Sequence, residues 1–272
     1  MCKEDVDAHY FKVILHGVKE DYPVLLSEND IVEYIKEVAP IDYEMPFKNN
    51  IMYVNLDEES DFYRYLKGQK VIKLSVNDRV DVRKRYGQSI EGTGDKIYEL
   101  QYFKFEDRTY GVLAWGWFAV TEFSKAIPAT DRNRGIRLRK LNIQVGNGDY
   151  LNQYFREARG NNYYYGEVHV VHENLRPNAA RDGLAPTAEA EVFFKMLRNY
   201  FNELKAIYTL ANKAKNAARD ISEARNRVDR DVSDEERQEA QVAFDKAKKK
   251  FQAVVQSVAK APYSQTDEAA RK

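Results

Sequence analysis

The sequence predicts an α+β fold, with strands and short helices followed by a long helical hairpin. Up to about residue 186, short segments alternate apolar and polar residues or are rich in β-branched and aromatic residues, which is typical of strands. From Thr187 to Lys260 there is no Gly or Pro, and apolar residues recur at spacings of three and four. That spacing is typical of helices that pack along a seam.

Composition narrows the class of protein. The 43 basic and 43 acidic residues balance, so no overall charge favours nucleic acid or a membrane surface. The single cysteine, Cys2, cannot form a disulfide within the chain, which fits a reducing compartment. No apolar run reaches membrane-spanning length, and the first 30 residues lack a signal-peptide layout. We expect a soluble cytoplasmic protein without a membrane partner.

The N-terminal elements are a strand and a helix. His9–Leu15 alternates like an edge strand. Ser27 is a candidate N-cap for a helix over Asp30–Val38, which Pro40 ends. The helix repeats apolar residues at one face, at Ile31, Tyr34, Ile35 and Val38.

The middle of the chain contains strand candidates. Two short ones, Lys70–Val76 and Arg79–Arg83, flank a turn, and Ile97–Phe105 with Arg108–Phe118 form the clearest hairpin. Trp115 and Trp117 share a strand face; a ligand or client surface is one reading, and a core covered by a helix is the favoured one.

A basic segment follows. Gly135–Val145 predicts one long strand on which Arg137 and Arg139 face solvent together, with Arg132 and Arg134 just before them. A solvated strand face is the favoured interpretation. Contact with phosphate, a nucleic-acid backbone or an acidic partner domain is the alternative.

The stretch that organises the chain is Tyr165–Leu184. It predicts a buried strand, a polar turn, and a loop in which Arg181 stands beside Asp182. A guanidinium offers a planar fork of donors to phosphate oxygens, so contact between Arg181 and a phosphate is one interpretation of this loop. Asp182 would orient Arg181 or cap the following helix. From the residues alone, a surface arginine paired with Asp182 is the favoured interpretation.

The last third predicts two helices. The first seam consists of Phe193, Leu197, Tyr200, Leu204, Ile207, Ala211, Ala214, Ala218 and Ile221. Asp229–Asp234 interrupts it, and a second seam runs from Phe244 to Val258. Two antiparallel helices within the chain explain both seams, and a coiled coil between two copies of the chain is the alternative. We expect disorder from residue 262 to 272.

No motif predicts a self-contained active site. His169 and His172 lie three apart and so face opposite sides of a strand, and no thiolate is near them in sequence. Zinc needs several convergent ligands, so no metal site is predicted.

One loop carries a family resemblance. Leu175, Asn178, Arg181 and Asp182 stand in the register of the Leu-x-x-Asn-x-x-Arg-Glu loop of heat-shock-90 middle domains, with Asp in place of the final Glu. The hairpin, the basic strand and an Ala39-Pro40 linker are similar too, so the chain resembles the transducer domain of GHKL-superfamily ATPases over residues 9–205. The resemblance implies a mixed sheet with a βαβ crossover, left-handed against the general rule. It also implies that Arg181, supported by Asn178 and Asp182, contacts the γ-phosphate of ATP in a neighbouring domain.

The chain departs from the superfamily in its nucleotide site. The Asn-bearing helix, the Asp-x-Gly-x-Gly segment and the glycine-rich lid that bind ATP are missing, as is a dimerisation domain of the chaperone type. We therefore expect no cofactor bound by this chain alone, and ATP with Mg²⁺ only through a GHKL nucleotide-binding domain in cis or in trans. Whether the chain is an enzyme stays open.

The resemblance divides the chain into four parts. Residues 1–45 would be the tail of a missing ATPase domain and a linker helix, 46–186 the middle domain, 187–261 the hairpin and 262–272 the tail. The implied function is the transducer of an ATP-dependent chaperone, with a protein client and a homodimer through the helices as open partners. The alternative is an interaction or nucleic-acid-associated module of a repair or defence system.

Overall fold

The fold is α+β and is built on a mixed five-stranded sheet. A computed structural model describes residues 12–54, 56–77, 80–228 and 234–259. The strand order is β3-β4-β7-β5-β6, with β5 parallel to β7 and the other neighbours antiparallel. The strands are β3 (Glu99–Asp107), β4 (Gly111–Val120), β5 (Gly135–Lys140), β6 (Ile143–Gln144) and β7 (Tyr165–Val170). A small separate sheet pairs β1 (Ser75–Val76) with β2 (Val80–Asp81).

Helices cover both faces of the large sheet. One face packs against the first half of α4 (Ala188–Val228), through Phe193, Leu197, Phe201 and Leu204. The other face packs against α2 (Met45–Phe47) and α3 (Asp61–Lys67), through Phe47, Phe62 and Leu66. β3 and β4 have apolar residues on both sides, whereas one side of β5 and β7 carries the buried polar residues Arg137, Arg139, Glu167 and His169. The sheet thus lies buried in the middle of the domain.

The β3–β4 hairpin and its tryptophans are as predicted. Tyr102 pairs with Trp117 in the antiparallel ladder. Trp117 is fully buried, and Trp115 stacks on Phe62 of α3 with 5.4 Å between ring centroids. The two tryptophans belong to the core under a helix.

The basic segment is a tight hairpin and not one long strand. β5 ends at Lys140, Leu141 and Asn142 take positive φ angles of 50° and 66°, and β6 returns antiparallel. Two successive residues with positive φ form the turn that suits the twist of a two-residue hairpin. The connection from this hairpin to the parallel strand β7 contains two short 3₁₀ helices, Tyr150–Tyr154 and Ala158–Tyr163.

At the N-terminal end, α1 (Glu28–Val38) has the predicted cap and the predicted end, and it begins just before the predicted Asp30. The Ser27 hydroxyl accepts a hydrogen bond from the amide of Asp30, which caps the helix. The apolar face differs from the prediction: Val32 is buried, whereas Tyr34 is exposed. Lys12–Leu15 form no strand, and the start of the predicted strand lies outside the described residues.

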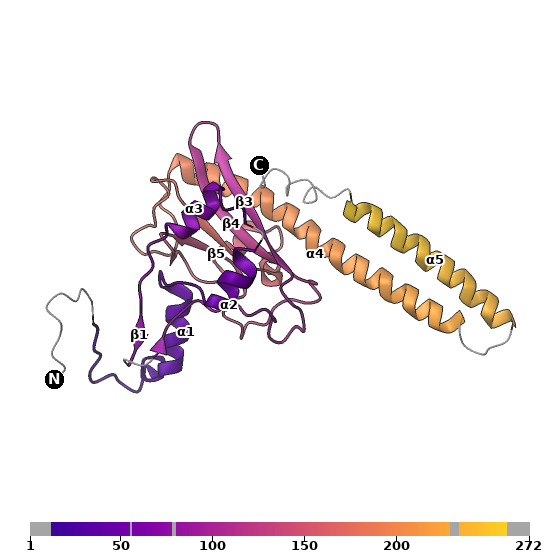
Figure 1. Cartoon of the computed structure of the whole chain (residues 1–272), viewed down its shortest axis with the longest axis horizontal. Coiled ribbons are helices and arrows are strands. Elements are labelled where there is room, and N and C mark those ends of the chain that lie inside the picture. Colours follow the sequence, from indigo (N-terminus) through magenta and orange to yellow (C-terminus); the bar gives the residue numbers. More distant parts are fainter. Residues whose placement is uncertain (1–11, 55, 78–79, 229–233, 260–272) are drawn as a thin grey trace.

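The two long helices fold back on each other within the chain. α4 and α5 (Asp234–Ala259) lie antiparallel and extend away from the sheet (Figure 1), and Lys250 of α5 pairs with Asp220 of α4 at 2.7 Å. Their seam is lined by buried alanines, among them Ala217, Ala224 and Ala247. The predicted seam was right at Phe193 and at other early positions.

The seam shifts by one residue along α4. Phe201 and Tyr208 are the buried residues where Tyr200 and Ile207 were predicted, and Ala217 is buried where Ala218 was predicted. The first part of α4 belongs to the core of the sheet, so the hairpin is continuous with the α/β part. The predicted disorder of residues 262–272 falls outside the described residues.

Candidate functional site

The Arg181 loop is short and closed by main-chain hydrogen bonds. Pro177 and Leu184 form a bridge at its base, and the amide of Asn178 donates to the carbonyl of Gly183 at 2.9 Å. The amide of Arg181 donates to the carbonyl of Asn178 at 3.1 Å. The loop therefore holds its tip in one conformation, although the tip is exposed.

Arg181 itself has a left-handed backbone, with φ of 57°. Residues with a Cβ rarely adopt this conformation, and it persists only where neighbours hold it. Here the Arg181 carbonyl accepts a 2.8 Å hydrogen bond from the amide of Gly146, in the turn after β6. The position of the arginine thus depends on a second segment of the chain.

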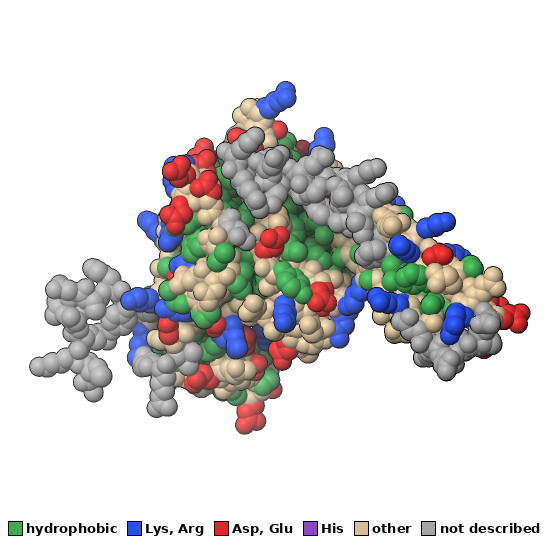
Figure 2. Space-filling view, turned by 45° about the vertical axis from the view of Figure 1, so that its right-hand side comes forward, with side chains coloured by type: hydrophobic (Ala, Val, Ile, Leu, Met, Phe, Trp, Pro, Cys, Tyr) green, Lys and Arg blue, Asp and Glu red, His purple; other side chains and the backbone are tan. Residues whose placement is uncertain are grey.

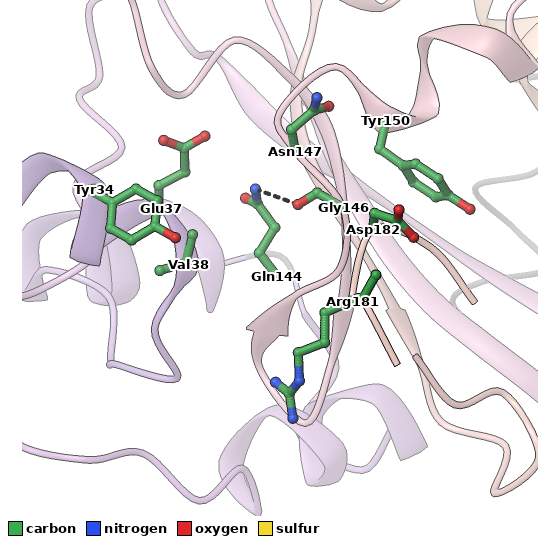
Figure 3. A pocket seen from close by; sticks show the side chains of 10 residues that line it. Tyr34, Glu37, Val38, Gln144, Gly146, Asn147, Tyr150, Arg181 and Asp182 are labelled. Carbon is green, nitrogen blue, oxygen red and sulfur yellow. Dashed lines mark hydrogen bonds between the residues drawn. The ribbon is translucent and has the colours of Figure 1, made fainter. Parts of the chain in front are cut away.

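Asp182 does not perform either role predicted for it. Its carboxylate accepts a 2.6 Å hydrogen bond from the Asn178 side chain, and no ion pair joins it to Arg181 in the described structure. The cap of α4 is Thr187, whose hydroxyl accepts from the amide of Ala190 at 3.2 Å. In Figure 3 the side chains of Arg181 and Asp182 leave the loop in different directions.

The Arg181 guanidinium is free within the part of the chain that the structure describes. It is exposed and makes no hydrogen bond or ion pair with any described residue. Asn178, in contrast, is tied to Asp182 and shapes the loop. A cation that is exposed, unpaired and fixed at its backbone is available to an anion from outside.

A pocket of about 330 Å³ lies next to this loop (Figure 3). Its walls come from the loop, from α1 and from the turn after β6. Its lining residues are Tyr34, Glu37, Val38, Gln144, Gly146, Asn147, Tyr150, Ala180, Arg181 and Asp182.

The predicted solvated basic face is wrong for two of its four arginines. Arg137 and Arg139 are only 4% and 1% exposed, because α1 and the following segment cover that side of β5. Arg137 pairs with Glu37 at 2.6 Å, and Arg139 pairs with Glu167 at 2.6 Å.

The other two arginines lie nearer the surface and also have acidic neighbours. Arg132 is 3.8 Å from Glu37, and Arg134 is 3.1 Å from Asp149. On the face shown in Figure 2, basic and acidic side chains are interspersed. These four arginines therefore do not form a basic surface for a nucleic-acid backbone.

Sequence reasoning missed a buried polar cluster on the same face of the sheet. Glu167 and His169 of β7 are fully buried and meet Lys84 and Arg139. Three further side chains complete the cluster: Tyr43 and Tyr86 donate to Glu167, and Asn142 accepts from Lys84. The signal in the sequence was a carboxylate and an imidazole two residues apart in an apolar strand.

Burial and the neighbouring charges shift the pKa values of the groups in this buried polar cluster. Burial acts to raise the pKa of Glu167, but Arg139 and Lys84 outweigh it and hold the pKa well below its ordinary value. Burial, aided by Arg139, lowers the pKa of Lys84 to about 7. Burial also lowers the pKa of His169, whose Nε2 lies 3.0 Å from Glu167. All of these charged groups are buried, so solvent does not reach them.

The described residues offer no metal site and no membrane span. No group of three or more His, Cys, Asp or Glu residues is arranged to hold a metal ion within the described ranges. In the same ranges, no helix combines the length and apolar character needed to cross a membrane.

Comparison with known proteins does not assign a family. No protein-family model matches the chain, and a search of curated proteins finds no significant similarity. Function has to be argued from the Arg181 loop and its surroundings.

Proposed function

We propose that this chain is the transducer part of a heat-shock-90-like ATPase of the GHKL superfamily. In this proposal, Arg181 contacts the γ-phosphate of ATP held by a separate domain. The observation that carries the proposal is the state of Arg181: its side chain is exposed and unpaired in the described structure, and its backbone is held by two hydrogen bonds.

The guanidinium of Arg181 has the chemistry that phosphoryl transfer requires of an arginine from a neighbouring domain. An arginine supplied by another domain stabilises the charge of the transition state only when the two domains close. The loop itself provides no phosphate-binding turn and no carboxylate set for Mg²⁺, so ATP and Mg²⁺ would belong to the partner. Preorganised main-chain hydrogen bonds lower the cost of ordering the arginine during closure.

The position of the loop is also suited to transmit its displacement to the helical hairpin. Only a few residues separate Asp182 from the start of α4, and α4 continues as one helix from the sheet into the hairpin. A displacement of the loop would thus be transmitted along a rigid helix. A protein client, as in chaperones, would act on or near that hairpin.

The proposal is tested by substitution of the arginine. ATP turnover is measured in the full-length protein, or with the GHKL nucleotide-binding domain encoded nearest to it. We expect Arg181→Ala to lower turnover by about 10²–10³-fold, since removal of one preorganised donor has this effect in other enzymes. Arg181→Lys keeps the charge but loses the planar fork and should recover only part of the activity.

Arg176→Ala is the matched control. Arg176 is exposed and lies five residues before Arg181, and its side chain donates a hydrogen bond to the Glu173 carbonyl. Turnover should be unchanged in this variant. Equal turnover in the wild type and in Arg181→Ala would contradict the proposed role of Arg181.

A further inference from the structure

We infer that a relay of hydrogen bonds from helix α1 to the Arg181 loop positions the arginine. The relay consists of Glu37, Arg137, Gln144 and Gly146, and it ends at the Arg181 carbonyl. These are positioning residues, because none of them needs to touch a substrate. The effect on ATP turnover rests on the proposed function, whereas the relay itself can be tested without it.

The first link attaches α1 to the sheet. Glu37, in the last turn of α1, accepts a 2.6 Å hydrogen bond from Arg137 Nη1 through its Oε1 atom. Its main-chain carbonyl accepts another, of 3.1 Å, from Arg139 Nη2. Val32 is the one buried residue of α1, so these polar contacts contribute much of what holds the end of the helix.

The second link crosses the β5–β6 hairpin. Arg137 Nη1 also donates to Gln144 Oε1 at 2.9 Å, and Gln144 Nε2 donates to the carbonyl of Gly146 at 3.1 Å. Both ends of the amide are therefore used. Arg137 and Gln144 are buried, so neither has water as a ready replacement for a lost partner.

The third link reaches the arginine. The amide of Gly146 donates to the Arg181 carbonyl at 2.8 Å, and both residues have positive φ angles, of 73° and 57°. A Cβ at position 146 would lie 2.6 Å from Cγ of Tyr150, so this turn requires glycine. The bond thus joins two backbone conformations that each need support.

The arrangement couples the docking of α1 to the backbone of Arg181. Glu37, Gln144, Gly146 and Arg181 all line the same pocket (Figure 3), so the relay runs along its wall. If α1 moves, Arg137 loses its anion, Gln144 loses its anchor, and the turn that holds Arg181 is free to relax. The basic strand would then serve internal positioning and not the binding of an external anion.

The relay is tested first by amide hydrogen exchange of this chain alone, and NMR measures the exchange rate of each amide. We compare Glu37→Ala, Gln144→Leu and the double variant with Glu33→Ala. Glu33 is the matched control, because it lies one turn earlier on α1 and pairs with Lys36 of the same helix. We expect the Gly146 amide to exchange about tenfold faster in Glu37→Ala and in Gln144→Leu, with the amide of Val168 in β7 unchanged.

The double variant distinguishes a relay from independent contacts. If the residues act in series, the double variant should exchange no faster than the faster single variant. Unchanged exchange of Gly146 in Glu37→Ala, or effects of the two substitutions that multiply, would overturn the relay. Glu33→Ala should behave as the wild type.

Turnover then tests the functional consequence. With the nucleotide-binding domain present, Glu37→Ala should lower ATP turnover about tenfold, and it should have no further effect in an Arg181→Ala background. If Arg181→Ala leaves turnover unchanged, the proposed function fails, and the exchange of Gly146 still decides whether the relay exists. If Arg181→Ala lowers turnover and Glu37→Ala does not, the positioning role is wrong.

Discussion

Glu167 is the residue on which the buried polar cluster depends. Its carboxylate contacts Arg139 at 2.6 Å and Lys84 at 3.4 Å, and all three side chains are at most 1% exposed. Breaking a buried ion pair by removing one partner costs more than the pair itself contributes, because a charge is left without compensation. The cluster joins β7, which leads to the Arg181 loop, to residues before β3.

Glu167→Gln should therefore destabilise the protein by about 3–5 kcal/mol. The measurement is the free energy of unfolding from urea denaturation. The control is Glu157→Gln, which removes a partly exposed ion pair with Lys205 and should destabilise the protein much less, because solvent screens that pair. A loss at Glu167 no larger than that at Glu157 would show that the cluster does not hold the fold together.

Lys84 makes stability depend on pH. Its folded-state pKa is about 7, below the ordinary value of 10.5, so between these values the unfolded chain binds more protons than the folded chain. Stability contributed by this group should rise from pH 7 to pH 9, by at most about 1.4 kcal/mol per pH unit. Burial raises the pKa values of Tyr43 and Tyr86, so these groups titrate above this pH range. Burial lowers the pKa of His169, so this group titrates below it.

The comparison is between wild type and Lys84→Met, with the exposed Lys73→Met as control. The free energy of unfolding should rise with pH in the wild type and in the control. It should be flatter in Lys84→Met. Identical slopes in all three proteins would refute the assignment to Lys84.

At the scale of elements, the helical hairpin relies on small residues along its seam. Ala217 is fully buried against α5, whereas the adjacent Ala218 is exposed. Alanine at a seam allows two helices to approach closely, and a charged side chain there has no partner. The same substitution should therefore destabilise the hairpin at position 217 and leave its stability nearly unchanged at position 218.

Ala217→Glu should separate the helices and lower the hairpin's unfolding free energy by about 2 kcal/mol or more. Ala218→Glu should leave it within about 0.5 kcal/mol of the wild type. Circular dichroism during urea unfolding measures both. Equal effects would mean that the seam is not at Ala217.

The success of sequence reasoning also differs by element. The β3–β4 hairpin and the two long helices follow from patterns within each segment, and the structure has them. Alternation also put Arg137 and Arg139 on one face correctly, but it could not show that this face is covered. Glu37, which pairs with Arg137, lies 100 residues away in the chain, and Glu167, which pairs with Arg139, lies in another strand.

The candidate site was predictable only in part for the same reason. Arg181 stood out as a strong cation in a polar loop, and it is indeed exposed on a closed loop. The pairing of Asp182 with Asn178 and the support from Gly146 depend on tertiary contacts. In the turn between β5 and β6, Asn142 was the missed signal, since Asn tolerates positive φ.

At the scale of the whole molecule, a continuous series of contacts connects α1, the sheet, the Arg181 loop and α4. α1 is held to the sheet by Glu37, the sheet holds the Arg181 loop through Gly146, and the loop leads into α4. A partner that binds near α1 and Arg181 could therefore influence the hairpin at the far end (Figure 1). Our proposal requires such a connection, because it has a nucleotide-dependent closure passed on to a distant helical region.

The most direct measurement is ATP turnover by the GHKL nucleotide-binding domain encoded nearest to this chain, with increasing amounts of the chain added. Our proposal predicts that turnover rises with the wild-type chain, saturates, and does not rise with Arg181→Ala. No stimulation by the wild-type chain, or equal stimulation by both, would contradict a transducer that donates Arg181.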